Sequence, residues 1–310
     1  MTNEIYGIDY LRRRLADKQT RVLLRYKYYE MKNNAQDFSS LAPEKFKGLK
    51  ETVGWCAKAV DSLADRLQFD EFQNDEFDLS EIFLSNNQDI LIDSAVLSAL
   101  ISACSFVYIR EDNGYPRLQV IDGSNATGII DPVTNLLTEG YAVLERDSMG
   151  VVKTEAYFMA GMTEIYSHGV LVQRIPNAAP YALLVPIIYR PDAKRPFGHS
   201  RISRACIAYT QTALRTIKRS EVSAEFYSFP QKYVLGLSED AEFNNRLATI
   251  SSFLNFTKDG DGDHPIVGQF QQQSMTPYTE QLRTLASLFA GETGPVSYTH
   301  LRAHETAANL

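Results

Sequence analysis

The chain has 310 residues, of which 44% are hydrophobic, and its formal net charge is −7. That length can bury one or two sizeable cores, and the acidic balance argues against a protein that binds nucleic acid through a uniformly basic surface. No apolar run reaches the roughly 18–20 residues of a membrane span, and no signal peptide is visible. Cys56, Cys104 and Cys206 give neither zinc-ligand spacing nor a disulfide framework.

The charged residues are grouped into blocks. Residues 11–32 hold eight basic and two acidic side chains, and residues 71–112 hold one basic and nine acidic. Residues 190–232 hold nine basic and three acidic side chains. The solvated faces of a monomer can carry such blocks, and the subunits of a ring also need complementary blocks where neighbours meet.

Helical periodicity dominates the first hundred residues. Leu11, Leu15 and Val22 recur near helical spacing in the first segment. A second stripe predicts a helix of about six turns that begins near Pro43 and packs on a core. Two shorter helices are predicted at residues 79–85 and 88–103. The stripe consists of Phe46, Leu49, Val53, Cys56, Val60, Leu63 and Leu67.

From Phe106 onward the apolar period is that of strands. Residues 106–110 and 117–121 flank the turn Asp112-Asn113-Gly114, which predicts a hairpin. Turn residues separate further short apolar runs, so we expect an antiparallel meander over residues 106–176 and a connection over 177–196. The further strands are predicted at 128–130, 140–146, 153–159, 163–166 and 171–175.

A long helix is predicted from Gly198 to Phe226, ended by Pro230. Strands are expected at 231–237, 253–256 and 266–269, with a short helix at 241–250. A final helix starts at residues 275–277 and runs to Glu292. The apolar face of the long helix is Ile202, Cys206, Tyr209, Ala213 and Ile217, and that of the final helix is Leu282, Leu285, Leu288 and Phe289. Together these elements predict an α+β fold.

The last residues have the character of a translated artefact. Residues 296–306 (VSYTHLRAHET) can be encoded by a transposon-end adapter used in sequencing libraries. We therefore expect residues 296–310 to be an artefactual, disordered tail, and the natural gene to continue beyond Gly294. His300 and His304, one helical turn apart, then carry no metal-binding signal.

No catalytic or metal-binding motif stands out. The sequence contains no phosphate-binding loop, no nucleophile elbow and no closely spaced His and Cys pair. Asp259, Asp261 and Asp263 alternate as at the start of a calcium loop, but His264 and Phe270 stand where that loop needs Gly and Glu. A solvated hairpin tip is the favoured interpretation. We expect no enzyme activity, no cofactor and no metal.

Four stretches, in order, resemble portal proteins of long-tailed double-stranded-DNA bacteriophages, and the resemblance spans residues 1–294. Residues 25–30 (RYKYYE) match an early helix end, although Met31 replaces the usual Gly. Trp55 with residues 60–67 (VDSLADRL) is the second stretch. Residues 196–202 (PFGHSRI), continuing to 230–236 (PQKYVLG), are the third, where His199 departs from a position more often Arg. Residues 281–294 (QLRTLASLFAGETG) are the fourth.

The resemblance implies the portal fold, in which each subunit has a wing, a stem, a clip and a crown. Residues 1–196 would form the wing, with helices in 1–105, the meander in 106–176 and the connection in 177–196. Residues 197–228 would form the first stem helix, 229–273 a small α/β clip, and 274–295 the start of the second stem helix. The crown would be missing.

The resemblance also implies a structural role. Portals form rings, typically of twelve subunits, at one capsid vertex, through which the terminase motor packages DNA that is later ejected. Expected partners are further copies, the large terminase subunit, head-completion or adaptor proteins, scaffold or major capsid protein, and DNA bound without sequence specificity, but no membrane. The expected location is the virion, and the host cytoplasm during assembly.

Two groups of residues are the site candidates. A subunit interface or DNA channel is expected to use Arg201, Arg204, Arg215, Lys218 and Arg219. Docking of terminase on the clip is expected to use Lys258, Asp259, Asp261 and Asp263. The alternative functions are another phage head–tail connector or structural protein, and a soluble enzyme with a helical cap.

Overall fold

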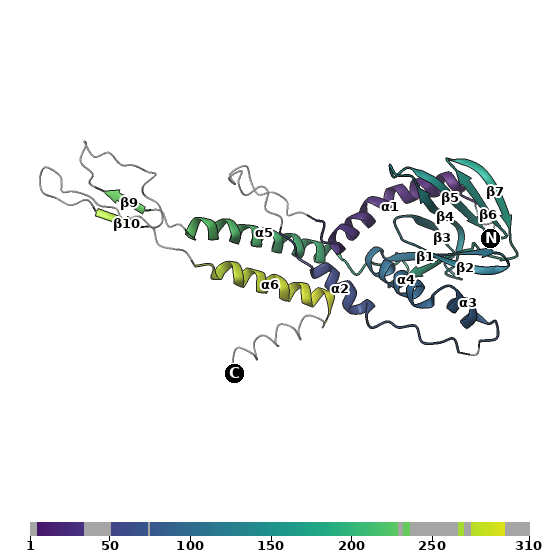
Figure 1. Ribbon diagram of the computed structural model, residues 1–310, viewed down its shortest axis with the longest axis horizontal. Coiled ribbons are helices and arrows are strands. Elements are labelled where there is room, and N and C mark those ends of the chain that lie inside the picture. The colour runs from purple at the N-terminus through teal and green to yellow at the C-terminus, as the bar shows by residue number, and fades with distance from the viewer. Residues whose placement is uncertain are drawn as a thin grey trace, which may run out of the picture. The chain divides into compact units, whose positions relative to one another are not determined.

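The computed structural model describes residues 5–33, 51–73, 75–228, 232–235, 266–269 and 274–294. Two compact units are present (Figure 1): unit 1 comprises Met1–Asn33, Thr52–Thr210 and Ser287–Leu310, and unit 2 comprises Asn34–Glu51 and Gln211–Ala286. Helices and antiparallel sheets are mixed, which confirms the α+β class. The predicted helix 241–250, strand 253–256 and tail 296–310 lie outside the described residues.

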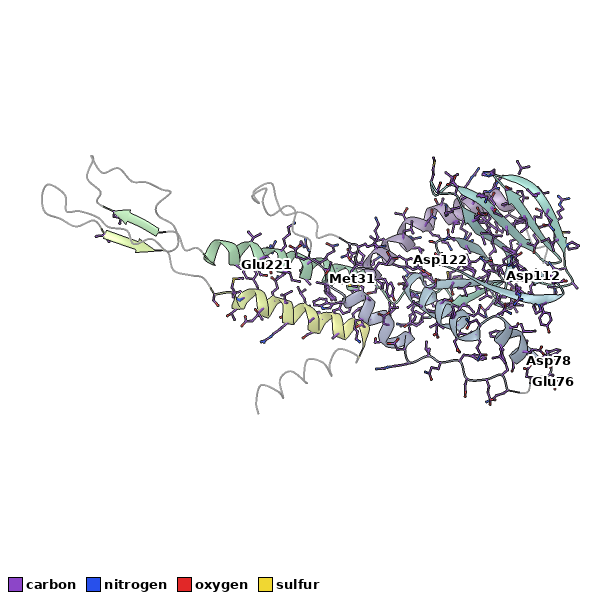
Figure 2. The ribbon with its side chains drawn as sticks, in the orientation of Figure 1. Met31, Glu76, Asp78, Asp112, Asp122 and Glu221 are labelled. Atoms are coloured by element: carbon purple, nitrogen blue, oxygen red, sulfur yellow. The ribbon has the colours of Figure 1, made fainter. Side chains whose placement is uncertain are left out.

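The first helix, α1 (Ile8–Tyr29), buries Leu11, Leu15 and Val22, as the periodicity predicted. It ends in a Schellman motif, in which the backbone N–H of Lys32 donates to the carbonyl of Lys27 (2.9 Å). Met31, at the end of α1 in Figure 2, has φ +56° and therefore occupies the left-handed position of that motif. Glycine is favoured there because it has no Cβ, which explains the Gly that the resembling family usually has.

The predicted six-turn helix is shorter in the described part of the chain. Helix α2 spans Trp55–Ala64, while Val53 is buried but lies before it, and Leu67 is 46% exposed after it. Gly54 is the N-cap, and glycine and β-branched residues both disfavour helix continuation. Phe46 and Leu49 lie outside the described residues. The two shorter predicted helices are confirmed as α3 (Leu79–Ser85) and α4 (Gln88–Ser102).

The predicted hairpin is confirmed as β1 (Cys104–Asp112) and β2 (Tyr115–Ile121), with Phe106 opposite Ile121. Asn113 and Gly114 both have positive φ, as a type I′ turn requires. The expected connection 177–196 contains an unpredicted strand, β8 (Leu184–Ile188), which pairs with β1. This strand was not predicted because it contains Pro186, and proline has no backbone N–H to donate to a neighbouring strand. It is tolerated here because β8 lies at the edge of the sheet β2-β1-β8.

A second sheet has the strand order β3-β4-β5-β6-β7, and its five strands confirm the predicted ones. The single meander over 106–176 was wrong, because β1 and β2 form the separate sheet with β8. One core lies between the two sheets and contains Phe106, Phe158 and Leu184, all fully buried. The strands are β3 (Ala126–Ile130), β4 (Leu137–Arg146), β5 (Val152–Met159), β6 (Met162–Ser167) and β7 (Val170–Pro176).

Helix α5 (Arg204–Ser228) begins six residues later than predicted. Gly198 has φ +72°, and the Ser203 hydroxyl caps the helix by accepting from the backbone N–H of Cys206 (3.2 Å). Helix α6 (Thr276–Thr293) confirms the final predicted helix, although its Leu288 is 48% exposed rather than buried.

Within unit 2, α5 and α6 run antiparallel. Thr216 donates to Gln281 (3.2 Å), and seven residues further along α5, about two turns, the hydroxyls of Ser223 and Tyr278 are 2.8 Å apart. Strands β9 (Lys232–Leu235) and β10 (Ile266–Gln269) form an antiparallel pair within the two predicted strand regions.

We expect Met31→Gly to raise the free energy of unfolding by about 1 kcal/mol, because the left-handed conformation costs a side-chain-bearing residue about that much. Urea unfolding at unchanged m-value measures it. The control is Glu30→Gly at the neighbouring exposed position, where φ is −78° and glycine brings only its entropic cost. Equal effects of both substitutions would contradict the prediction.

Candidate functional site

A buried cluster in unit 1, the hub, joins segments that are far apart in sequence. Tyr28 comes from α1, Val60 from α2, Ile202 from the turn before α5, and Phe289 from α6. Each of the four stretches that carry the family resemblance contributes one of these residues. The buried members are Tyr28, Cys56, Ala59, Val60, Leu100, Ile101, Ile202, Cys206 and Phe289.

Arg201 connects three of these segments by hydrogen bonds. Its guanidinium donates to the carbonyl of Ala59 (3.2 Å) and to that of Thr293, the last residue of α6. Its backbone N–H donates to the carbonyl of Leu100 (2.8 Å). The last carbonyls of a helix lack partners within the helix and carry partial negative charge, so the guanidinium both caps α6 and complements its dipole.

Serines complete the polar contacts around Arg201. The Ser200 hydroxyl donates to the carbonyl of Ile101 (2.6 Å), close to the end of α4. The Ser203 hydroxyl, which caps α5, donates to the carboxylate of Glu292 (2.7 Å). The first turn of α5 is therefore tied to the last turn of α6 within unit 1.

The RYKYYE stretch supplies polar contacts on the α1 side of the hub. The hydroxyls of Tyr26 and Ser98 are 2.8 Å apart, and the hydroxyl of Tyr29 donates to Asp61 (2.9 Å). Arg25 donates to the carbonyl of Ser102 (2.9 Å), the last residue of α4. Burial raises the pKa of Tyr26 to about 12, so this phenol is neutral at ordinary pH.

The thiols near the hub are packing groups. Cys56, Cys104 and Cys206 are all buried, and burial raises the pKa of the Cys56 thiol to about 11. A nucleophilic cysteine needs a lowered pKa and solvent access. The Cys56 sulfur instead lies 3.4 Å from the hydroxyl of Thr210.

A second polar constellation escaped the sequence analysis. Three consecutive strands, β4, β5 and β6, each carry Glu-x-Tyr, at Glu139 and Tyr141, Glu155 and Tyr157, and Glu164 and Tyr166. Residues two apart lie on the same face of a strand, so the repeat itself was the available signal. All three carboxylates are buried.

Hydrogen bonds connect phenols and carboxylates of this repeat on neighbouring strands. The Tyr157 hydroxyl donates to Glu139 (2.5 Å), and the Tyr141 hydroxyl donates to Glu155. Burial is the main cause that raises the pKa of both tyrosines, and the facing carboxylate adds to it. Neutral phenols thus satisfy buried carboxylates, as buried charge requires.

Helix α1 closes this constellation. The carboxylate of Glu139 accepts from the backbone N–H groups of Tyr6 and Gly7 (2.9 Å each), just before α1. Arg12 donates to Glu155, with its Nε 3.2 Å from the carboxylate. The first turn of α1 is therefore fixed to the sheet by two buried carboxylates.

Part of the basic block 11–32 is thus directed into the fold. Besides Arg12 and Arg25, Lys18 donates to the carbonyl of Ala126 (2.7 Å), and its ammonium lies 5.4 Å from the ring centre of Phe106. Burial lowers the pKa of Lys18 because it disfavours the charged form. The sequence suggested that this block forms a solvated face or a subunit interface. Either interpretation can apply only to the side chains of the block that are not directed into the fold.

The predicted interface or channel residues occupy different environments. Arg201 is half-buried in the hub, Arg204 and Arg219 are exposed, and Arg215 donates to Thr212 (3.1 Å). Lys218 is only 4% exposed. Arg204 and Arg219 therefore lie at the surface, whereas Lys218 does not. The clip candidates Lys258, Asp259, Asp261 and Asp263 lie outside the described residues.

Two other features, a metal-binding cluster and a membrane-spanning helix, are not found in the described part of the chain. Among the described residues, no group of three or more His, Cys, Asp or Glu side chains could hold a metal ion. Within that same part of the chain, no helix is long and apolar enough to cross a membrane.

Comparison with known proteins shows a distant similarity to a phage protein. No family model matches the chain. The portal protein of Mycobacterium phage L5 is 22% identical over an alignment of 307 residues, which covers 91% of this chain and 62% of that protein. The chain is therefore similar to a portal protein along most of its own length, and it spans less than two thirds of that relative.

We expect Arg201→Met to lower the free energy of unfolding by about 2–3 kcal/mol, since it keeps the apolar stem but removes charge-assisted hydrogen bonds to two carbonyls. The matched control, Arg204→Met, changes an exposed residue three positions on and should stay within about 0.5 kcal/mol. Chemical denaturation monitored through Trp55 measures both. A similar small loss for the two variants would show that Arg201 does not hold the hub.

We expect Tyr26→Phe to be less stable than wild type by about 1 kcal/mol below pH 10, because it loses one hydrogen bond. The folded pKa of about 12 exceeds the unfolded value of 10.0, so wild type loses this stability as pH rises from 10 towards about 12. Denaturation at several pH values should therefore show the gap narrowing. Tyr10→Phe, on the exposed side of α1, is the control, and parallel curves for Tyr26→Phe and wild type would refute the assignment.

Proposed function

We propose that this chain is a structural subunit of a phage portal, a ring at one capsid vertex through which the terminase motor packages double-stranded DNA that is later ejected. The observation that carries the proposal is the hub. Four stretches that resemble portal sequences, at residues 25–30, 55–67, 196–202 and 281–294, meet there in one buried core. The similarity to a portal protein over 91% of the chain supports the same assignment.

The chemistry of the polar clusters also favours a structural role. The buried carboxylates Glu139 and Glu155 are saturated by phenols, backbone N–H groups and Arg12, so neither of these two carboxylates is poised to accept a proton from a substrate. The hub carries a protonated thiol and capped helix ends. Both constellations hold segments together.

The parts of a portal subunit can be proposed for this chain. Residues 1–196 would be the wing, and α5 and α6 would belong to the two stem helices, which is consistent with their antiparallel contacts in unit 2. The β9–β10 pair would lie in the clip, residues 229–273, where terminase and head-completion proteins dock. Scaffold or major capsid protein would surround the ring.

The charge balance is suited to a channel. DNA has to slide through a portal, and dense lysine and arginine contacts to phosphate would give tight, salt-dependent binding. The net charge of −7 is consistent with a bore that does not grip DNA. Of the predicted interface residues, Arg204 and Arg219 lie at the surface, whereas Lys218 is buried.

We expect the full-length protein to assemble into closed rings with a central hole, typically of twelve subunits. Native mass spectrometry gives the subunit number, and electron microscopy shows the hole. A protein that stays monomeric or forms only twofold dimers across a wide concentration range would overturn the proposal. The Arg201→Met variant weakens the hub and serves as a control for folding. If ring assembly requires an intact hub, this variant should form fewer rings than wild type.

A further inference from the structure

A short acidic segment projects an aromatic ring from unit 1. Phe77 is 77% exposed and lies between two exposed carboxylates, Glu76 and Asp78. An aromatic ring in this position contributes little to the core, and exposed aromatic side chains are typical anchors of protein–protein contacts. We call residues 76–78 the acidic knob.

Contacts directly before the acidic knob fix it to the start of α3. Asp75 caps α3, because its carboxylate accepts from the backbone N–H groups of Leu79 and Ser80 (2.7 Å each). Three rings from α3 and from the segment that precedes the knob pack on one another, with centroids 4.8–5.7 Å apart. They belong to Phe69, Phe72 and Phe83.

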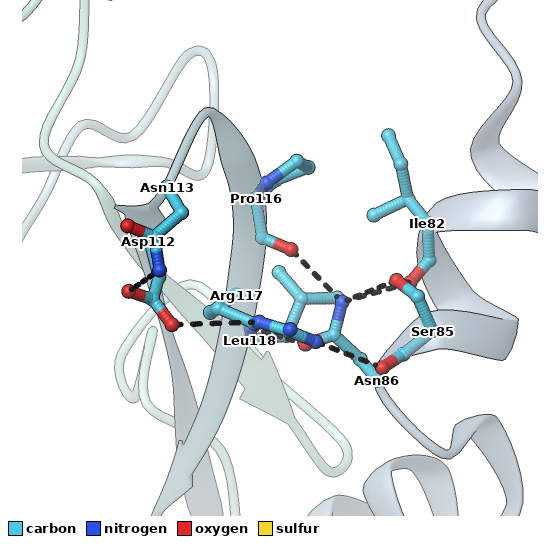
Figure 3. A network of polar contacts seen from close by, with 8 residues as sticks. All are labelled: Ile82, Ser85, Asn86, Asp112, Asn113, Pro116, Arg117 and Leu118. Carbon is cyan, nitrogen blue, oxygen red and sulfur yellow. Dashed lines mark hydrogen bonds and ion pairs between the residues drawn. The ribbon is translucent and has the colours of Figure 1, made fainter.

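The other end of α3 is fixed to the hairpin (Figure 3). The side-chain amide of Asn86 donates to the carbonyl of Pro116 (3.0 Å) and accepts from the backbone N–H of Leu118 (2.9 Å), so it pairs with the outer edge of β2 as a strand would. Arg117 donates to the carbonyl of Ser85 (3.0 Å). A segment fixed at both ends loses little conformational entropy on binding, which favours its use as a docking element.

A complementary surface lies on α1. Leu24 is 43% exposed and lies between the exposed Arg21 and Lys27, three residues away on either side and therefore on the same helical face. The neighbouring Leu23 is 45% exposed. Neither Arg21 nor Lys27 has an ion pair among the described residues. We call Arg21, Leu23, Leu24 and Lys27 the basic face.

The two surfaces share one pattern with opposite charge, and they lie apart on unit 1. In each, an apolar side chain is flanked by two like charges. Figure 2 labels Met31 at the end of α1 and Glu76 and Asp78 beside α3, well separated, and α4 contacts both helices. A knob and its complement at different places on one chain cannot pair within that chain.

We propose that the acidic knob of one copy docks on the basic face of the next copy of this chain. Phe77 would contact Leu23 and Leu24, while Glu76 and Asp78 face Arg21 and Lys27. Because the two surfaces differ, the contact is head-to-tail and repeats in one direction, which closes into a ring when the rotation permits. The inference rests on the proposed function for the existence of a ring and adds which surfaces form it.

Charge reversal in the full-length protein tests the pairing. The first variant combines Glu76→Lys with Asp78→Asn, because asparagine tolerates the φ of +54° at position 78. The second combines Arg21→Glu with Lys27→Glu. Each variant should weaken subunit association at least about tenfold, since like charges then face each other at the contact. The variant that carries all four substitutions should recover rings.

A mixing experiment separates the inference from the proposed function. In the first variant both surfaces are basic, and in the second both are acidic, so neither should form rings alone but the two should co-assemble in a one-to-one ratio, as measured by native mass spectrometry. If wild type forms rings and both variants form them equally well, the inference fails and the proposed function stands. If wild type forms no rings, the proposed function fails.

Phe77→Ala tests the apolar anchor and should reduce association about tenfold, within the range of a central contact residue. Met149→Ala is the matched control, because Met149 is 88% exposed in the turn between β4 and β5. Both variants should keep wild-type thermal stability, as expected for exposed side chains. Equal ring populations for Phe77→Ala and Met149→Ala would show that Phe77 is not part of the interface.

Discussion

The guanidinium of Arg201 links backbone carbonyls of α2 and α6, while the backbone N–H of the same residue binds the carbonyl of Leu100 in α4. These bonds matter because the ends of helices leave carbonyls without partners, and a buried carbonyl without a partner is costly. Arg201 satisfies the end of α6 and at the same time fixes the turn that leads into α5. The hub residues Ile202 and Phe289 are buried beside it, so apolar packing and hydrogen bonding specify the same arrangement.

Buried carboxylates play the corresponding role at the other end of α1. Glu139 and Glu155 would be costly inside a sheet without partners, and phenols from the neighbouring strand together with the start of α1 supply them. The helix therefore docks in a defined register rather than by apolar contact alone. This explains why several positive charges of a helix that reads as a basic surface are directed inward. The exposed Arg21 and Lys27 are the two that flank Leu24.

For the proposed ring, this division of charge has a consequence. Side chains that hold the fold together cannot also mediate assembly, so the interface has to be sought among the exposed residues. The basic face and the acidic knob meet that condition, and each is supported from behind by a fixed element, α1 by the sheet and the knob by Asp75 and Asn86. Rigid, charge-complementary surfaces favour a specific head-to-tail contact over random association.

The class of fold, the positions of most helices and strands, and the resemblance to portals could be predicted from the amino-acid sequence, because periodicity and turn residues are local signals. The sequence placed the hairpin at Asn113-Gly114, since that turn requires two residues tolerant of positive φ. Three features became evident only in the folded chain: β8 joins β1 despite Pro186, the strands divide into two sheets, and Arg201 and Lys218 are turned inward. Those outcomes depend on which distant backbone edge or carbonyl lies within reach, and neither composition nor spacing encodes that.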